Sequence, residues 1–245
     1  MTQALPNVPV LPLDPAIKAK LEGITTATLT TVLLKKGLRK VWMAGTTPFC
    51  HTGKRQVGRA FTLRFVPARE DLATPASWAS PISTRAAIEA MPDGVIAVID
   101  AMGSKEAGVF GDILCARMKK RGVAGLVTDG VVRDGDGVKG TNLPVWCSGA
   151  SAPASVAALT FVSWQEPIGC GGVAVFPNDV IVADGDGAVL IPQDMLEAVV
   201  DAAVEQEHLE TWLMQQVENG IPLPGLYPPN AENKARYEKE TGRKA

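Results

Sequence analysis

The sequence is short of the residues that build zinc sites and hydrolase triads. Its 245 residues include two histidines, His51 and His208, and four cysteines. A histidine-based zinc site needs more ligands than these, and neither histidine accompanies the glycine pattern of a nucleophile elbow. No CxxC pair occurs among the cysteines, which are Cys50, Cys115, Cys147 and Cys170. We therefore expect reduced, mostly buried thiols, and neither a histidine zinc site nor Ser-His-Asp catalysis.

Excess charge and long apolar runs are absent as well. The formal net charge is -2 and 20% of the residues are charged, which gives no electrostatic reason for binding nucleic acid or an anionic membrane. No apolar stretch reaches the roughly 18 residues that a membrane-spanning helix requires. The first residues, MTQALPNVPVLPLDP, lack the cationic segment and apolar run of a signal peptide. We expect a cytoplasmic protein without nucleic-acid or membrane partners.

Apolar residues, in contrast, make up 46% of the chain, enough to bury a sizeable core. The composition changes along the chain and indicates a central unit with an extension at each end. We divide the chain into an N-terminal arm with helices (1–55), an α/β core (56–192) and a C-terminal helix with a Pro-rich tail (193–245).

The extensions contain recognisable helix signals. Residues 1–13 are Pro-rich and predict an extended arm. Asp14 caps a predicted helix through about Glu22, and a threonine caps another over 25–37. A helical pattern runs from Gln193 to about Val217. The Pro-rich and charged tail beyond it has little to fold around alone, so we expect it to pack on the body or on a neighbouring subunit.

The central segment alternates strands and helices. Residues 56–67 alternate apolar and polar side chains as a strand does, and 95–102 and 123–128 are apolar runs typical of buried strands. Between those two runs, 108–122 opens with glycines and becomes an amphipathic helix. This unit predicts a right-handed βαβ crossover. A capped helix over 83–94 precedes it, and short runs punctuated by Gly, Pro and Asp predict β-rich structure after residue 140.

Two charged motifs fall at the edges of these elements. TDGVVRD, residues 128–134, places acids and an arginine where a buried strand ends, and GDIL, residues 111–114, lies at the start of the preceding helix. If strands 95–102 and 123–128 are parallel neighbours, the motifs meet at one end of the sheet, where α/β proteins commonly bind ligands. We therefore expect a single site that contains residues of both motifs.

The residue types in the motifs indicate an anionic ligand and a metal ion. Free N–H groups at the helix start, around Gly111 and Asp112, suit a carboxylate, and Arg133 can grip one with its fork of donors. Asp134 offers a hard oxygen ligand for Mg²⁺, which takes few protein carboxylates. The alternative is that Asp112 only caps the helix and that Arg133 and Asp134 only form a loop ion pair. Asp129 is assigned no role beyond bracing the turn.

Other motif interpretations do not fit the spacing. DGDG at 134–137 would begin an EF-hand loop, but the required glycine and glutamate positions hold Lys139 and Val145. GCGG at 169–172 lacks the dinucleotide-binding spacing, and there is no Walker A lysine motif. The sequence gives no support for calcium-loop or nucleotide chemistry.

The set of motifs resembles the RraA-like family. The resemblance covers roughly residues 20–195, and its most specific part is GDxL followed by RD, with 22 positions from Gly111 to Arg133. The family contains class II pyruvate aldolases, such as 4-hydroxy-4-methyl-2-oxoglutarate aldolase, and non-enzymatic regulators of ribonuclease activity. It implies an α/β/β sandwich related to swivelling domains, here with helical N- and C-terminal extensions. It also implies a homotrimer or homohexamer with sites between subunits.

The resemblance also implies roles for particular residues. It assigns Mg²⁺ or Mn²⁺ binding to Asp134, and catalysis to Arg133 and Asp112. A C-terminal extension brings a glutamate to the neighbouring site in some of the aldolases, and Glu205 or Glu207 could serve here, although a solvated helix face is the favoured interpretation of both. The residues that would contact substrate are Gly111, Asp112, Ile113, Leu114 and Arg133.

The mechanism implied by the resemblance is metal-dependent cleavage of a 4-hydroxy-2-oxoacid to pyruvate and a carbonyl product. The metal would chelate the substrate and stabilise the enolate formed when C3–C4 breaks. Arg133 would neutralise the same oxygens, and a water oriented by Asp112 would take the C4 hydroxyl proton. Oxaloacetate decarboxylation is the expected side activity.

Two alternatives stand beside the aldolase hypothesis. The runner-up is a non-catalytic regulator of ribonuclease activity that binds other proteins, since regulators can retain much of the motif. Methyl transfer to a quinone is set aside, because the sequence lacks the glycine-rich loop of a methyl-donor site. The substrate beyond the pyruvyl unit stays open between a dicarboxylic acid and a 2-keto-3-deoxy sugar acid.

Overall fold

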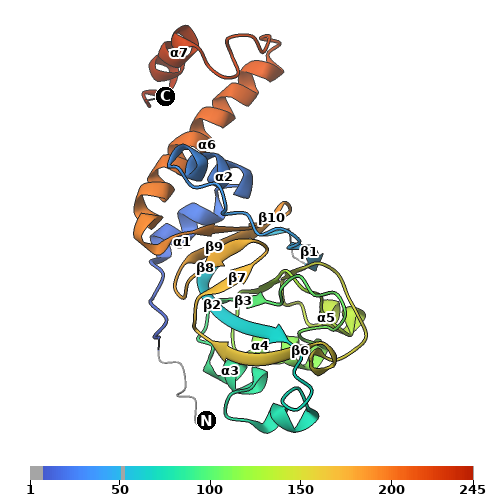
Figure 1. The fold of residues 1–245 in the computed structure, drawn as a ribbon. Coiled ribbons are helices and arrows are strands. Elements are labelled where there is room, and N and C mark those ends of the chain that lie inside the picture. The colour runs from blue at the N-terminus through green and yellow to red at the C-terminus, as the bar shows by residue number, and fades with distance from the viewer. Residues whose placement is uncertain (1–7, 51–52, 245) are drawn as a thin grey trace.

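The protein is built in layers of helices and strands (Figure 1). The structure is a computed structural model and describes residues 8–50 and 53–244. Three buried apolar clusters separate the layers, and strand residues alternate between them. In the strand β3 (Ile96–Asp100), Ile96 and Val98 belong to one cluster, whereas Ala97 and Ile99 belong to the next. This period of two follows from the pleat of a strand, and it shows that both faces of the sheet are buried.

The layers form an α/β/β sandwich, which confirms the predicted fold class. One cluster lies between the sheet and helices α3 (Thr84–Ala90), α4 (Asp112–Lys120) and α5 (Gly135–Gly140). A second lies between the sheet and a further strand layer. That layer consists of β7 (Ile168–Cys170), β8 (Val173–Val175), β9 (Val180–Asp184) and β10 (Gly187–Ile191).

The strands of the two layers are joined in one hydrogen-bonded path with the order β1-β5-β4-β3-β2-β9-β10, and β6 also pairs with β2. The pairs β2–β3, β3–β4 and β4–β5 are parallel, as predicted for the βαβ unit, and the others are antiparallel. The remaining members are β1 (Thr47–Cys50), β2 (Gln56–Pro67), β4 (Gly125–Thr128), β5 (Val145–Cys147) and β6 (Leu159–Trp164).

Strand β2 connects the two strand layers. Residues 56–59 pair with β9, residues 60–64 pair with β3, and residues 63–67 pair with β6. A strand of twelve residues is long enough for its two halves to pair with different neighbouring strands. The sequence predicted its bounds correctly, because alternation of apolar and polar residues persists along most of its length.

The terminal extensions share a third apolar cluster on the outer face of β9 and β10. It contains residues of α1 (Pro15–Glu22), α2 (Thr26–Lys35) and α6 (Leu196–Glu218). The predicted caps are present, since Asp14 accepts hydrogen bonds from the first N–H groups of α1 and Thr25 accepts one from Thr28. None of the described helices is long and apolar enough to cross a membrane.

The predicted N-terminal arm lies only partly within the described residues. Residues 1–7 and His51 fall outside them, whereas residues 8–13 contain neither helix nor strand, as expected. Asn178 fixes this part of the arm, because its side chain accepts from Leu11 N at 2.8 Å and donates to Pro9 O at 3.0 Å. The arm therefore follows the edge of the body.

The C-terminal tail packs on α6 of the same chain. Helix α6 projects beyond the body and α7 (Ala231–Thr241) folds back toward its end (Figure 1). Their small cluster is formed by Trp212, Leu213, Leu226 and Tyr237. The rings of Trp212 and Tyr237 meet edge to face at 5.7 Å, and Trp212 Nε1 donates to Glu240 at 2.7 Å. This second helix was not predicted from the sequence, because its residues are mainly charged.

The cysteines behave as buried apolar residues, as predicted. All four are free, and three of them are buried. Burial raises the pKa of the Cys115 thiol to about 12 and that of the Cys147 thiol to about 11. Because only the thiolate is a good nucleophile or metal ligand, neither thiol has the ionisation that such chemistry requires near neutral pH.

Asp184 connects the core to the N-terminal helices. Its carboxylate accepts bonds from Thr26 N at 2.9 Å and Thr26 Oγ1 at 2.7 Å, and from Arg55 Nε at 3.2 Å. Burial by itself raises the pKa of this carboxyl, but the hydrogen bonds from Thr26, Asp186 and Arg55 outweigh it and hold the pKa below its usual value. The ionised form is therefore the form that stabilises the fold.

We expect Asp184→Asn to lower the free energy of unfolding at pH 7 by about 2 kcal/mol, through loss of charge-assisted hydrogen bonds. Because the folded pKa is depressed, the contribution is present above the unfolded pKa of about 3.9 and is lost as the pH falls through the folded value. Urea denaturation from pH 7 to pH 3 should show the variant and the wild type converging at low pH. Asp201→Asn, at a side chain that is 75% exposed, is the matched control. A constant difference at every pH would contradict this assignment.

Candidate functional site

The predicted site is assembled by backbone hydrogen bonds between three segments. Val109 N donates to Val131 O at 2.8 Å, and Arg133 N donates to Phe110 O at 2.9 Å. On the other side, Val132 N donates to Gly149 O at 3.0 Å. The loop after β4 is thus held between the loop before α4 and the loop after β5. This arrangement fixes the backbone of both motifs at the carboxyl ends of the parallel strands, as the sequence predicted.

The GDIL motif forms the N-terminus of α4. Gly111 is the N-cap residue and Asp112 is the first helical residue, so Asp112 is not the N-cap that the alternative interpretation assigned. The first internal bond of the helix is Cys115 N to Gly111 O, and Ile113 N instead donates to Asp112 Oδ1 at 2.7 Å. Within the described residues, the N–H groups of Asp112 and Leu114 have no partner. They are suited to a ligand carboxylate.

Arg133 and Asp134 lie beside this helix start. Arg133 Nε donates to Asp134 Oδ2 at 2.8 Å, which is the loop ion pair considered as the alternative. Asp134 has φ 51° and ψ 48°, a left-handed conformation that is uncommon outside glycine. A Cβ at Gly111 would lie 2.8 Å from Asp134 Oδ2, so a side chain at this position would displace the Asp134 carboxylate from its observed place. Strained backbone of this kind often occurs at functional sites.

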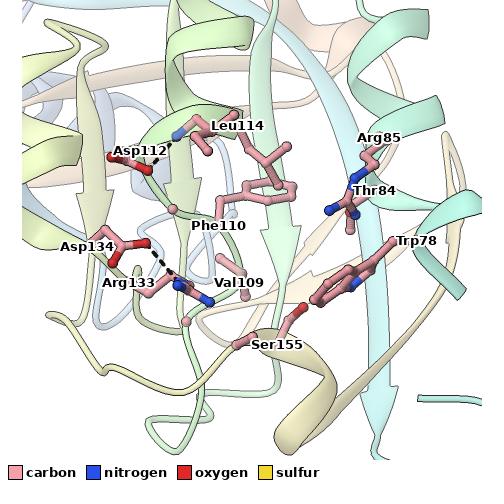
Figure 2. Close-up of a pocket in the computed structure, with 14 residues that line it drawn as sticks. Trp78, Thr84, Arg85, Val109, Phe110, Asp112, Leu114, Arg133, Asp134 and Ser155 are labelled. Atoms are coloured by element: carbon pink, nitrogen blue, oxygen red, sulfur yellow. Dashed lines mark hydrogen bonds and ion pairs between the residues drawn. The ribbon is translucent and has the colours of Figure 1, made fainter. Parts of the chain in front are cut away.

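A cavity of about 390 Å³ brings the predicted residues together. Figure 2 shows Asp112, Asp134 and Arg133 along one side of it. Ile113 borders the cavity with a side chain that is 78% exposed, and its N–H is already bonded to Asp112 Oδ1. Apart from Glu205 and Glu207, every residue of the predicted substrate and metal set lines the cavity: Gly111, Asp112, Ile113, Leu114, Arg133 and Asp134.

The opposite wall contains residues that the sequence analysis did not select. They are Trp78, Thr84, Arg85 and Ser155. Trp78 belongs to the short helix η1 (Pro75–Ala79) in a long loop, and Ser155 begins η2 (Ser155–Ala157). No local pattern marks these residues, because loops distant in sequence bring them to the cavity.

Asp129 braces the turn, as expected. It is 7% exposed and accepts bonds from Ala101 N at 2.9 Å and Gly171 N at 3.2 Å. Burial raises the pKa of its carboxyl, although the two N–H groups act in the opposite direction. The residue connects the ends of β3 and β4 to the second strand layer and does not line the cavity.

Glu205 and Glu207 have partners within their own chain. Arg243 Nη1 donates to Glu205 Oε1 at 3.0 Å, and Thr25 N donates to Glu207 Oε1 at 2.8 Å. Both belong to α6 and neither lines the cavity of the same chain. Their contribution to a neighbouring site stays a prediction.

The donor set at the cavity fits a hard cation. Among the described residues, no group of three or more His, Cys, Asp or Glu side chains could hold a metal. What is present is two carboxylates, Asp112 and Asp134, beside free N–H groups. Mg²⁺ keeps several waters and is commonly bound through one or two carboxylates, whereas structural zinc sites need four protein ligands. The site therefore suits Mg²⁺ or Mn²⁺ better than zinc.

Fold and cavity together define an α/β/β protein with a candidate site for anionic ligands at the carboxyl ends of its parallel strands. A family model described as RraA-like, Aldolase/RraA, matches residues 26–190. The chain belongs to this family, as the resemblance in the sequence indicated.

Two solved structures are similar to this chain. Streptomyces coelicolor RraAS2, described as an unusual member of the RNase ES inhibitor RraA protein family, is 34% identical with a TM-score of 0.74, covering 83% of this chain and 98% of that one. An uncharacterised protein from Pseudomonas syringae is 26% identical with a TM-score of 0.75, covering 89% and 99%. The layered fold is therefore shared along most of the chain.

One curated protein similar to this chain has an aldolase name. A protein of Halalkalibacterium halodurans, provisionally named 4-hydroxy-4-methyl-2-oxoglutarate aldolase, is 38% identical over 123 residues. The match covers 50% of this chain and 58% of the relative, which is less than two thirds of its length. Both an aldolase name and a ribonuclease-inhibitor name thus occur among proteins similar to this one.

Proposed function

We propose that this protein is a divalent-metal-dependent aldolase that cleaves a 4-hydroxy-2-oxoacid to pyruvate and a carbonyl product. The observation that carries the proposal is the meeting of Asp112, Arg133, Asp134 and the α4 N-terminus in one cavity. An acid able to hold a cation beside a helix start able to hold a carboxylate is the arrangement that metal-assisted chemistry on a 2-oxoacid requires. The aldolase name of the Halalkalibacterium relative supports the same conclusion.

Different residues of the chain bind different parts of the substrate. The N–H groups at the start of α4 and the guanidinium of Arg133 hold the carboxylate and carbonyl oxygens of the 2-oxoacid. Asp134 would hold Mg²⁺ or Mn²⁺, which supplies Lewis-acid stabilisation of the charge that develops on the pyruvyl half. Asp112 orients a water that takes the proton from the C4 hydroxyl as the C3–C4 bond breaks and the C4 carbonyl forms. The same water then gives a proton to C3, which becomes the methyl group of pyruvate. Oxaloacetate has the same 2-oxoacid group, so its decarboxylation is a side activity.

Metal-dependent release of pyruvate is the test of this function. Purified protein is incubated with 4-hydroxy-4-methyl-2-oxoglutarate, oxaloacetate and 2-keto-3-deoxy acids, and pyruvate is measured after quenching. We expect release with Mg²⁺ or Mn²⁺, loss of at least 95% of it on the order of minutes after EDTA addition, and recovery with excess metal. Borohydride with substrate should trap no adduct, because no lysine forms a Schiff base.

Two results would count against the aldolase. A borohydride-trapped adduct or turnover that is insensitive to EDTA would replace the metal mechanism. Absence of pyruvate from every substrate, with folded protein and bound metal, would favour the second candidate, a protein-binding regulator of ribonuclease activity. The likeness to RraAS2 is the observation that supports that candidate.

A further inference from the structure

One cation of the cavity is not used by the proposed chemistry. Arg85, in the first turn of α3, lines the wall opposite Arg133 (Figure 2). Its guanidinium carbon lies 4.8 Å from the centre of the Trp78 ring. A guanidinium stacked on an aromatic face keeps its edge N–H donors available, and stacking restricts the side chain before any ligand arrives.

Arg85 has no acidic partner within the described part of the chain. The other arginines of this region are paired, since Arg133 contacts Asp134 and Arg69 contacts Asp71. The single interaction of the Arg85 side chain among the described residues is the one with Trp78. A guanidinium that has no acidic partner and is restricted by an aromatic ring beside a cavity is suited to bind a carboxylate or phosphate.

Hydroxyl groups beside Arg85 can complete such a subsite. Thr84 and Ser155 line the same wall, and neither hydroxyl has a hydrogen bond to the described residues. Thr84 is only 6% exposed, and Thr84 and Ser155 also border an adjoining cavity of about 710 Å³. There is consequently room for a ligand group larger than a methyl group next to Arg85.

We propose that Arg85, positioned by Trp78, is the specificity-determining residue for the half of the substrate beyond the cleaved bond, and that it selects a carbonyl product bearing an anionic group. This inference rests on the proposed function, in which Arg133 and the α4 N-terminus hold the 2-oxoacid end. A molecule anchored there has its far end at the opposite wall. Carboxylate and phosphate share the chemistry that Arg85 recognises.

Two matched substrate pairs distinguish a carboxylate from a phosphate as the anionic group. 4-Hydroxy-2-oxoglutarate and 4-hydroxy-2-oxopentanoate differ in one carboxylate, and 3-deoxy-2-oxo-6-phosphogluconate differs from 3-deoxy-2-oxogluconate in one phosphate. In each pair, kcat/KM is measured for the member with the additional anionic group and divided by kcat/KM for the member without it. We expect a ratio of about tenfold to a hundredfold in one pair, the range for a charge-assisted contact. That pair identifies the anion.

Variants connect the ratio to Arg85. Arg85→Met should reduce the ratio to about one to three, and Trp78→Leu should reduce it in part with Arg85 still present. Arg117→Met is the matched control: it removes an arginine that is already paired with Glu89 and lines neither cavity, and it should leave the ratio unchanged. A high ratio that persists in Arg85→Met, or falls equally in Arg117→Met, overturns the proposal.

A binding measurement decides the inference without turnover. The Kd values of 2-oxoglutarate and 2-oxopentanoate are compared by calorimetry, and so are those of 2-oxo-6-phosphooxyhexanoate and 6-hydroxy-2-oxohexanoate. All four lack the C4 hydroxyl and cannot be cleaved by this route. A tenfold preference for one anionic member that disappears in Arg85→Met supports the subsite. Equal affinities, or no binding at all, overturn it. Turnover without an anionic preference would leave the aldolase standing and remove only the role of Arg85.

Discussion

Arg133→Ala is expected to lower kcat/KM for pyruvate release by about 10³-fold, the scale found when one charge-stabilising donor is removed from an active site. The variant loses the guanidinium that holds the 2-oxoacid and also frees Asp134 Oδ2, which Arg133 Nε contacts at 2.8 Å. Because the Arg133 side chain is 37% exposed and its backbone bonds remain, the fold should be retained. Kinetics with saturating Mg²⁺ and a thermal melt of the same sample provide the measurement.

The conservative variant separates the charge from the fork geometry. Arg133→Lys keeps a positive charge but loses bidentate binding, so we expect activity between those of the wild type and the alanine variant. Arg117→Ala is the matched control, since this arginine of α4 pairs with Glu89 on the exposed side of the helix and does not line the cavity. If Arg133→Ala retained more than about a tenth of the wild-type activity, the role of Arg133 in substrate binding would be wrong.

Gly108→Ala is expected to inactivate the site by displacing the backbone that carries the functional side chains. A Cβ at Gly108 would lie 2.4 Å from Arg133 N and 2.6 Å from Val132 C, distances at which the backbone must move. Gly108 also forms a parallel bridge with Val131, so the shift separates the two loops that carry the motifs. We expect pyruvate release to fall by at least about 100-fold and the free energy of unfolding to fall by about 1–3 kcal/mol.

A second glycine provides the control for this prediction. A Cβ at Gly140, at the end of α5, meets no atom within 4 Å, so Gly140→Ala should preserve activity and leave stability equal or slightly higher. Both variants are compared by urea denaturation, pyruvate release and the Kd for oxalate as a two-carbon dianion. Wild-type kinetics in Gly108→Ala would show that the spacing of the two loops does not govern the site.

The predictions from sequence succeeded where local patterns repeat over many residues. Strand β2 was predicted with its observed bounds, and the runs at 95–102 and 123–128 became the parallel neighbours β3 and β4. From that parallel pairing, the meeting of GDIL with Arg133 and Asp134 followed, since the carboxyl ends of parallel strands share one edge. The family assignment depended on the same motifs.

Short elements and charged segments gave weaker signals. Helix α5 has six residues, GDGVKG, and begins after the left-handed Asp134, so it is too short for its sequence to show a helical period. Helix α7 forms because Tyr237 is buried against Trp212 of α6, and its own sequence is largely polar. In both, contacts from elsewhere in the fold supply the stability that local propensity does not.

The sequence by itself determined the class of fold, the two charged motifs and the end of the sheet at which they lie. Only the tertiary structure decided which side chains face them across the cavity. Trp78, Arg85 and Ser155 come from a loop, from α3 and from η2, and no spacing rule relates them to Arg133. Their positions are fixed by packing between segments up to about 77 residues apart, whereas periodicity reports only on neighbours within a few turns or strand residues.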